Sequence, residues 1–412
     1  MKKASIISIG NELLSGATVD TNAAFLSTQL LKLGVPVVTG YTIGDTLDSI
    51  VNALKLAVAD ADFVLVTGGL GPTDDDLTRQ GFAEFLGCEL ELRPDLLQKI
   101  ETFFTSRNRK FSPVNRIQAY IPAGAEAIEN NFGTAPGIMV QTQGKLIVSL
   151  PGVPSEMKQM FEETVFDKIK TLAGSGAIAV RKLKCFGTGE SNIAEMLGDL
   201  MARKRNPLIN CTVSYGVITL HIIAKAEDKN TADAMAEKDE QMLVELLGDL
   251  VYGSGEQSLA EVLGRKLIDQ QKKIAIAESC TGGLIAKLLT DIPGASKYFT
   301  HGWVTYSNTA KTQELGVPAE LIEKYGAVSE QVASAMACAA AKKAGSDVAI
   351  GITGIAGPEG GSEQKPVGLV YIAVMSDNSC SGRRFVFSHD RRFVRFRAAQ
   401  TALNMLRLKL QS

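Results

Sequence analysis

Residues 272–289, KKIAIAESCTGGLIAKLL, decide the fold of the C-terminal part of the chain. Residues 274–277 are a short apolar run typical of a buried strand, and apolar residues return at helical spacing from Leu284. The glycine-rich segment 278–283 between them therefore predicts a tight turn from a strand into a helix. Because the first N–H groups of a helix have no intrahelical partner, such a turn can hold a phosphate or an oxyanion.

Ser279 lies in this turn and is a candidate nucleophile, since a side chain at the end of a strand can face a cleft. Gly282 and Gly283 would allow a ligand to approach the backbone closely. The alternative is that Ser279 or Thr281 only caps the following helix, a position for which Ser and Thr are preferred. The local sequence leaves both interpretations open.

The composition is that of a globular protein with more than one domain. The 412 residues suffice for two or three domains, and 45% are hydrophobic and 21% charged. The net charge of −2 provides no basic footprint for nucleic acid, and no apolar run approaches the roughly 18 residues that span a membrane. The six cysteines are scattered without a CxxC pair, which indicates reduced thiols. The first apolar run is interrupted at Gly10, too early for a signal peptide, so we expect a cytoplasmic protein.

In the first third of the chain, strands alternate with helices, the pattern of parallel βαβ units with helices on both faces of the sheet. In such sheets, ligands bind outside the carboxyl ends of the strands. Two turns lie at such ends, SIGNELLSG at 8–16 and TGGLGPTDDD at 67–76. The expected strands are 4–9, 36–42 and 62–67, and the expected helices are 22–33, 46–59 and 76–86.

The turn at 67–76 combines glycines with three adjacent aspartates. Backbone N–H groups of the glycines could cradle a phosphate, yet the aspartates would repel it. A divalent cation that bridges carboxylate and phosphate oxygens resolves this conflict. The alternative, that Thr73 or one aspartate caps the next helix, accounts for one of these residues but not for three aspartates.

The middle of the chain predicts a small α+β module without a cluster of candidate catalytic groups. Its expected strands are 181–186 and 217–226, and its expected helices are 191–201 and 231–247. Residues 251–257, VYGSGEQ, carry a Gly-Ser-Gly sequence and are the best linker in the chain. We therefore expect a fragment that begins near Ser258 to fold alone.

The last part of the chain alternates strands and helices again and predicts a second α/β domain. Its second glycine-rich turn, TGIAGPEGG at 353–361, also follows an apolar strand and could open toward the cleft of Ser279. The expected strands, besides 274–277, are 297–306, 347–352 and 367–374, and the expected helices are 259–270, 332–344 and 391–410.

A nucleophilic serine needs a base, and no histidine is in a suitable place to provide it. His221 falls in the middle module, and neither His301 nor His389 lies in a motif. Lysine is the other common base for serine, provided that burial lowers its pKa. Lys311 follows a strand and a tyrosine and is the candidate; the alternative is an ordinary exposed lysine.

Motifs throughout the chain resemble one family. SIGNELLSG, DTN, TGGLGPTDDDLT, NFGTAPG and LPGVPSEM resemble the N-terminal domain of the competence/damage-inducible CinA family, which is related to molybdopterin-binding domains. ESCTGG, GAS at 294–296, YSNTAK, GITGIAGPEGG and KPVGLVY resemble the nicotinamide-mononucleotide deamidase domain of that family. The resemblance implies a Rossmann-like molybdopterin-binding-type domain at 1–170, a small α+β linker module at 175–252 and an α/β amidase domain at 256–412.

The resemblance also implies roles for individual residues of the C-terminal domain. Ser279 would be the nucleophile and Lys311 its base. Three residues would support or position this pair: Tyr306, Ser296 and Thr353. An arginine of the terminal helix, Arg391 or Arg395, would hold the phosphate or the carboxamide of the substrate. The further substrate-binding residues would be Ser296, Thr281, Gly282, Gly283, Gly354 and Gly357.

In the N-terminal domain, the resemblance implies a phosphate- and nucleotide-binding pocket at the TGGLGPTDDD turn, with Asp75 and Asp76 as metal ligands. The metal would be a divalent ion, Mg, Mn or Co, and potassium is a second candidate ion. The other residues of this pocket would be Glu12, Asn22, Gly68, Gly69, Gly71 and Thr73.

The implied function is pyridine-nucleotide salvage by two hydrolases. The C-terminal domain would convert nicotinamide mononucleotide to nicotinate mononucleotide and ammonia without a cofactor. The N-terminal domain would cleave ADP-ribose to AMP and ribose 5-phosphate with a divalent metal. We expect a homodimer, from the resemblance and because symmetric dimers are the commonest soluble assemblies. The alternatives are a molybdopterin-binding protein with a degenerate C-terminal domain, or a non-enzymatic regulator of DNA uptake or damage response.

Overall fold

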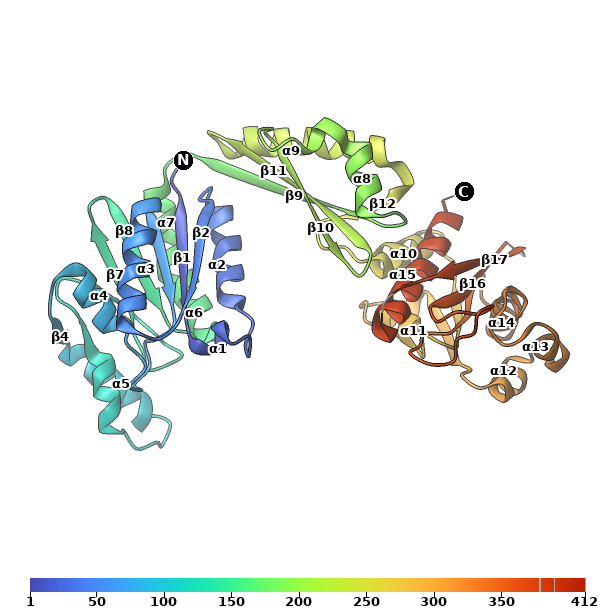
Figure 1. Cartoon of the computed structure of the whole chain (residues 1–412), viewed down its shortest axis with the longest axis horizontal. Helices are drawn as coiled ribbons and strands as arrows, with labels where there is room; N and C mark the ends of the chain where they lie inside the picture. The colour runs from blue at the N-terminus through green and yellow to red at the C-terminus, as the bar shows by residue number, and fades with distance from the viewer. Residues whose placement is uncertain (378, 389, 412) are drawn as a thin grey trace. The chain divides into compact units, whose positions relative to one another are not determined.

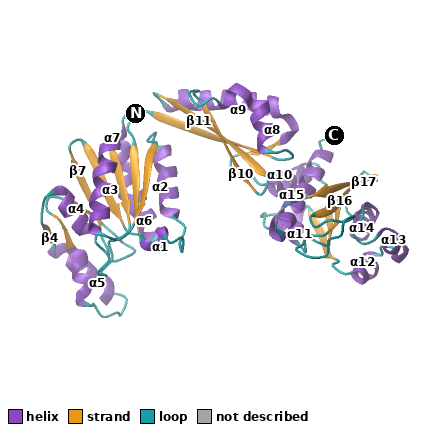
Figure 2. Cartoon of the chain, in the orientation of Figure 1, coloured by secondary structure: helices purple, strands orange, loops and turns teal. Residues whose placement is uncertain are grey.

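A computed structural model describes residues 1–377, 379–388 and 390–411 (Figure 1). His389 therefore lies outside the described residues. Contacts between residues divide the chain into two compact units. The first is Met1–Ala179 with Ala224–Met235, and the second is Val180–Ile223 with the residues from Ala236 onward. Each unit combines helices and strands, which confirms the predicted α/β class (Figure 2).

The N-terminal domain contains a six-stranded sheet in the order β2-β1-β3-β8-β7-β6. The first four of these strands are parallel, and the β8–β7 and β7–β6 pairs are antiparallel. All residues of β1 and β3 are buried, as expected for central strands covered on both faces. The strands are β1 Ala4–Ile9, β2 Val37–Ile43, β3 Phe63–Thr67, β6 Glu126–Ile128, β7 Gly137–Thr142 and β8 Lys145–Leu150.

Helices cover both faces of this sheet, as the βαβ pattern predicts (Figure 2). Helices α2 (Thr21–Lys32), α6 (Pro154–Met160) and α7 (Phe166–Ala173) pack on one face, and α3 (Leu47–Asp60) and α4 (Thr78–Leu86) on the other. Helix α4 begins two residues later than predicted, because the Asp76 carboxylate accepts hydrogen bonds from Thr73 and closes a turn there. The domain also contains the short elements α1 (Asn11–Leu14), β4 (Leu90–Leu92) and β5 (Tyr120–Pro122) and the helix α5 (Pro94–Thr105).

The middle module is a four-stranded sheet in the order β10-β11-β9-β12. The first part of the predicted linker at 251–257 is wrong, because Val251–Ser254 forms strand β12 and pairs antiparallel with β9; residues 255–257 lie between β12 and α10 (Leu259–Asp269). Tyr252 is buried in this strand, so the segment is held by side-chain packing as well as by the ladder. The other strands are β9 Ala177–Cys185, β10 Leu208–Ser214 and β11 Val217–Ala226, and the helices are α8 Glu190–Leu197 and α9 Lys229–Leu247.

The middle module shares a hydrophobic core with the C-terminal domain. Phe186 and Tyr252 belong to the same buried cluster as Leu263 and Val394 of the C-terminal domain. The buried Arg407 guanidinium donates hydrogen bonds to the backbone carbonyls at 249 and 251. A fragment that begins near Ser258 would lose these contacts. We therefore expect it to be less stable than the same residues in the full chain.

The C-terminal domain contains a five-stranded sheet in the order β14-β13-β15-β16-β17. Strands β14, β13 and β15 are parallel, and β16 and β17 continue the sheet antiparallel. The strands are β13 Ile274–Glu278, β14 Phe299–Val304, β15 Val348–Gly354, β16 Leu369–Ser376 and β17 Ser379–Val386. Strand β17 was not predicted from the sequence.

Alternating residues of β13 face opposite layers of helices. Ile274 and Ile276 pack toward α10 (Leu259–Asp269), α11 (Leu284–Thr290) and α15 (Arg391–Lys409). Ala275 and Ala277 pack toward α12 (Asn308–Leu315), α13 (Ala319–Tyr325) and α14 (Glu330–Ala344). None of the helices in the described part of the chain has the length and apolar content needed to cross a bilayer.

Candidate active site

The structure brings the predicted nucleophile and base together. Ser279 directly follows β13, and Lys311 projects from α12. The Nζ atom of Lys311 lies 3.0 Å from the Oγ atom of Ser279. Ser279 is 7% exposed and Lys311 only 1%. Lys311 is therefore not an ordinary exposed lysine, and the two side chains form a buried pair.

The surroundings of Lys311 favour a neutral amine. Its Nζ atom lies 2.9 Å from the Thr305 carbonyl and 3.3 Å from the Tyr306 carbonyl. No carboxylate pairs with this lysine among the described residues, and burial lowers its pKa. A neutral amine has two N–H donors and one lone pair, which matches two carbonyl acceptors and one serine O–H donor. The geometry is thus that of a general base placed on a nucleophile.

A carboxylate, and not a phosphate or an oxyanion, occupies the N-terminus of α11. The buried Glu278 side chain accepts hydrogen bonds from the N–H groups of Ile285 (3.1 Å) and Ala286 (2.8 Å). The prediction that these N–H groups are free for a ligand is therefore wrong. The capping alternative for Ser279 is wrong as well, because Glu278 caps the helix and the Ser279 hydroxyl faces Lys311.

The two glycines of the turn connect the nucleophile segment to α11. Gly282 and Gly283 have φ angles of +60° and +88°, a conformation that favours glycine. The Gly282 N–H donates to the Ser279 carbonyl at 3.1 Å and closes the turn. The Thr281 carbonyl accepts from Arg395 of α15, with its Nη2 atom at 2.6 Å and its Nε atom at 3.2 Å. Arg395 therefore contacts the nucleophile turn; that it or Arg391 holds the phosphate or the carboxamide of the substrate stays a prediction.

The other predicted arginine lies at the exposed edge of the site. The Arg391 guanidinium donates to the Tyr306 hydroxyl and to the Gly357 carbonyl, both at 3.0 Å. Tyr306 is 58% exposed. Arg391, Tyr306 and Gly357 thus connect α15 with the loops that follow β14 and β15.

Among the described residues, no hydrogen bond joins three of the predicted residues to Ser279 or Lys311. The Thr353 hydroxyl donates to the Ala327 carbonyl at 2.9 Å. Gly354 packs against β16, where a Cβ atom would lie 2.6 Å from the Leu369 carbonyl. Ser296 precedes β14, whose Phe299 pairs with Ile274 at the start of β13. Ser296 therefore lies toward the end of the parallel strands opposite to the end that Ser279 follows.

The N-terminal domain has a cavity of about 410 Å³ at the carboxyl ends of β1 and β3. It lies where both predicted ligand-binding turns meet. Of the predicted pocket residues it is lined by Glu12, Gly68, Gly69, Gly71, Asp75 and Asp76, and Asp45, Gln118 and Glu156 line it as well. Thr73 instead donates a hydrogen bond to the Asp76 carboxylate. The Asn22 side chain donates to the Gly152 carbonyl at 2.8 Å and so fixes a loop that lines the cavity.

The start of α4 orients the glycine loop of this cavity. Four successive carbonyls, those of residues 68–71, accept hydrogen bonds from Thr78 and Arg79. Arg79 is 1% exposed, and burial lowers its pKa to about 10. Arg79 was not predicted from the sequence, although it precedes the buried Phe82 and Ala83 by three and four residues and so shares their helix face.

Carboxylates crowd this cavity. Burial raises the pKa of Asp45, and the nearby charges of Glu12, Asp75 and Asp76 raise it further. In the chain as described, no group of three or more Asp, Glu, His or Cys side chains is arranged to hold a metal ion. Asp75 and Asp76 line the cavity beside the glycine loop, and carboxylate oxygens are ligands that Mg²⁺ takes together with phosphate oxygens.

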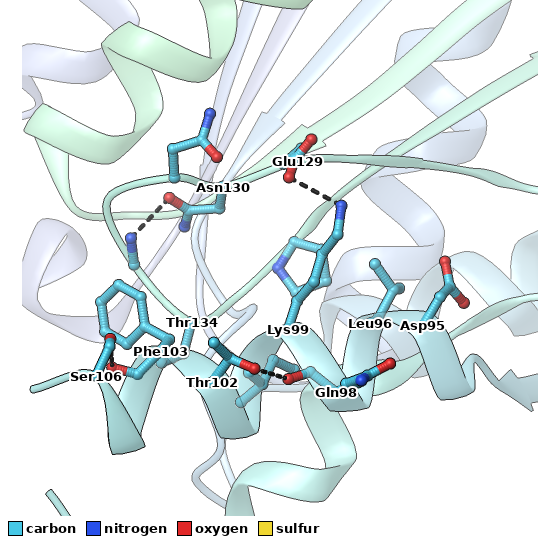
Figure 3. A pocket seen from close by; sticks show the side chains of 14 residues that line it. Asp95, Leu96, Gln98, Lys99, Thr102, Phe103, Ser106, Glu129, Asn130 and Thr134 are labelled. Atoms are coloured by element: carbon cyan, nitrogen blue, oxygen red, sulfur yellow. Dashed lines mark hydrogen bonds and ion pairs between the residues drawn. The ribbon is translucent and has the colours of Figure 1, made fainter. Parts of the chain in front are cut away.

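A second cavity of about 480 Å³ adjoins the first, between α5 and the loop at 129–136 (Figure 3). Thr134 lines both cavities. Asn130 organises the loop between them, since its side chain accepts from the Gly133 N–H and donates to Glu156. Lys99 of α5 pairs with Glu129 at 2.8 Å across the second cavity (Figure 3). The NFGTAPG motif therefore separates two neighbouring cavities.

Comparison with known proteins divides the chain into three segments. Residues 5–171 match a family described as a probable molybdopterin binding domain. Residues 180–253 match the damage-inducible protein CinA KH domain, and residues 256–410 match the CinA C-terminal domain.

Similar proteins extend over the whole chain. A putative competence-damage inducible protein of Caldicellulosiruptor bescii is 41% identical over 99% of both chains, and a CinA-like protein of Dictyoglomus thermophilum is 43% identical over 98% of both. A solved structure of a CinA protein of unknown function from Thermoplasma acidophilum is 40% identical; it covers 40% of this chain and 97% of its own, with a TM-score of 0.38. The chain belongs to the competence/damage-inducible CinA family.

Proposed function

We propose that the C-terminal domain is an amidase that hydrolyses nicotinamide mononucleotide to nicotinate mononucleotide and ammonia. The observation that carries this proposal is the 3.0 Å contact between Ser279 and a buried Lys311 that has no carboxylate partner among the described residues. A buried lysine without a counter-ion costs folding free energy, so its retention favours a chemical role. This pair also argues against a degenerate C-terminal domain.

The reaction follows from the protonation states of the pair. Neutral Lys311 removes the proton of Ser279 as the Ser279 oxygen attacks the carboxamide carbon. The lysine ammonium then gives this proton to the leaving nitrogen, which departs as ammonia. Water hydrolyses the acyl-enzyme with Lys311 again as the base, which returns the serine hydroxyl and releases the carboxylate.

The negative charge of the tetrahedral intermediate requires N–H donors. The N–H group of Ser279 donates to the Ile352 carbonyl, and that of Gly282 donates to the Ser279 carbonyl, so neither is free. We infer that the N–H groups of Cys280 and Thr281, which directly follow the nucleophile, are the donors. Arg391 at the exposed edge would hold the substrate phosphate, since a guanidinium group suits bidentate phosphate binding.

We further propose that the N-terminal domain cleaves ADP-ribose to AMP and ribose 5-phosphate. The supporting feature is the glycine loop, whose carbonyls all bind to α4 residues, beside a crowded set of carboxylates. Asp75 and Asp76 would hold a divalent ion together with the pyrophosphate oxygens. This ion would neutralise phosphate charge, and the loop would position the pyrophosphate.

The decisive experiment measures both reactions on the purified full-length chain. Ammonia release from nicotinamide mononucleotide, with nicotinate mononucleotide identified by NMR, tests the amidase. AMP release from ADP-ribose with and without Mg²⁺ or Mn²⁺ tests the pyrophosphatase. Absence of both products from folded protein would favour a non-enzymatic regulator.

A further inference from the structure

The first two turns of α15 contact the candidate amidase site. Arg391 donates to the Tyr306 hydroxyl and to the Gly357 carbonyl. Arg395 donates to the Thr281 carbonyl, two residues beyond the nucleophile. Residues four apart lie on one face of a helix, so the position of this helix start determines where both guanidinium groups lie.

The same two turns contact the tip of the β10–β11 hairpin in the middle module. The centroid of the Tyr215 ring lies 4.9 Å from that of Phe396 and 6.2 Å from that of Phe393. Arg397 donates a hydrogen bond to the Gly216 carbonyl. Aromatic pairs at these distances are stabilising beyond the area that they bury. The hairpin tip therefore fixes the part of α15 that carries both arginines of the site.

The turn at this tip has an unfavourable residue at its first position. Tyr215 and Gly216 form a two-residue connection with φ angles of +47° and +78°. Turns with positive φ at both positions favour Asn-Gly or Asp-Gly, and a tyrosine at positive φ is uncommon. The positive φ angle of Gly216 favours glycine at the second position, and a Cβ atom there would also displace the Arg397 guanidinium, whose Nη1 atom would lie 1.5 Å away. The turn thus tolerates a strained tyrosine whose ring packs on α15.

We propose that the hairpin tip, Tyr215–Gly216, braces α15 and thereby positions Arg391 and Arg395 for substrate binding in the amidase site. This inference rests on the proposed amidase function. Tyr215 is a positioning residue, because it acts through α15 and not on the substrate. The middle module therefore contributes to substrate affinity through α15, although the described hydrogen bonds of Lys311 all go to residues of the C-terminal domain.

The test replaces Tyr215 in the full-length protein. Tyr215→Asn removes the ring but suits positive φ, so the hairpin stays folded. We expect the KM for nicotinamide mononucleotide to rise roughly 3- to 10-fold, the loss expected for one aromatic pair, with kcat within about twofold of the parent. Hydrogen exchange of the α15 amides at 393–397 should become faster. Tyr215→Phe keeps the ring and should retain the parent KM and exchange rates.

A matched control is available in the N-terminal domain. Gln143 and Gly144 connect β7 to β8 with φ angles of +50° and +77°, the same backbone conformation as at the brace. Gln143→Asn should change neither the KM nor the exchange of α15.

Either of two results would overturn the brace. One is unchanged exchange and KM in Tyr215→Asn; the other is a Tyr215→Phe variant as impaired as Tyr215→Asn. A parent protein that releases no ammonia would instead refute the amidase function, and exchange at α15 would still decide whether the hairpin fixes the helix.

Discussion

The N-terminal and C-terminal domains place their candidate sites at the same point of two similar sheets. In each sheet, the first strand lies between the second and the third, and all three are parallel: β2-β1-β3 in one and β14-β13-β15 in the other. In both sheets, the second strand therefore lies on one side of the central first strand and the third strand lies on its other side. The carboxyl ends of β1 and β3, and of β13 and β15, frame these switch points, where ligands of such folds bind.

The side chains at the two switch points differ in charge and in burial. The N-terminal site is a cavity of about 410 Å³ lined by glycines and five carboxylates, among them Asp45, whose pKa is raised. The C-terminal site is a buried serine and lysine. The one carboxylate of its turn, Glu278, caps α11 by accepting a backbone hydrogen bond. Similar backbones thus carry different groups at the same place, and the two proposed reactions, metal-assisted phosphate chemistry and acyl transfer, rest on this difference.

The largest expected effect is that of Ser279→Ala. Removal of the nucleophile should lower the rate of ammonia release at least about 10³-fold. ADP-ribose cleavage should remain at the parent rate, and the free energy of unfolding should change by only about 1 kcal/mol because the helix cap is Glu278. Steady-state assays of both activities and a urea titration check this. Ser381→Ala on β17 is the matched serine control, and a Ser279→Ala enzyme with parent turnover would refute the mechanism.

Removal of divalent metal should have the next largest effect, on the other domain alone. Chelation with EDTA should lower ADP-ribose cleavage by about 100-fold or more, since a bound ion contributes several kcal/mol of charge stabilisation. Ammonia release should be spared, because the Ser279–Lys311 pair needs no ion. Asp75→Asn combined with Asp76→Asn should reproduce the effect of EDTA. Loss of ammonia release from chelated but folded protein would mean that the C-terminal chemistry also uses a metal.

The pH dependence of the amidase should report on Lys311. Only the neutral amine is a base, so kcat/KM should rise about tenfold per pH unit and level off above the pKa of Lys311. Burial lowers this pKa below its ordinary value of 10.5, so the plateau should begin below pH 10.5.

The lowered pKa of Lys311 also affects the free energy of unfolding. The folded state binds fewer protons than the unfolded state between the lowered pKa and 10.5, so the free energy of unfolding should rise with pH over that interval. Lys311→Arg should abolish activity at every pH, because arginine stays protonated. A flat kcat/KM profile in the parent would exclude a lysine base.

The sequence predicts those features of the two domains that depend on local patterns. The buried strands β1, β3 and β13 are continuous apolar runs, and the turns that follow them are rich in glycine. Ser279 and Lys311 could be identified because a strand end and a motif mark each of them. Strand β17 could not be predicted, since its sequence SCSGRRFV is polar and only the ladder with β16 makes it a strand.

The contacts of residues whose partners are distant in the sequence could not be predicted either. Thr353 and Ala327 are 26 positions apart, so no local pattern links the Thr353 hydroxyl to its acceptor. The place of Ser296 depends on the register of β14 against β13, which only the folded sheet defines. The capping role of Glu278 could not be predicted either, because it accepts from N–H groups seven and eight positions later, which is not a standard capping pattern.

The smallest expected effect, that of Tyr306→Phe, distinguishes substrate binding from chemistry at the exposed edge of the amidase site. The Tyr306 hydroxyl accepts from Arg391 at 3.0 Å, and the tyrosine is 58% exposed. Loss of one such hydrogen bond is worth about 0.5–1.5 kcal/mol, so the KM for nicotinamide mononucleotide should rise about 2- to 10-fold while kcat stays near the parent value. Tyr325→Phe on α13 is the matched control, and ADP-ribose cleavage should not respond to either change. If turnover instead fell by roughly two orders of magnitude or more, the Tyr306 hydroxyl would take part in proton transfer, and the amidase would need a third catalytic group beside Ser279 and Lys311.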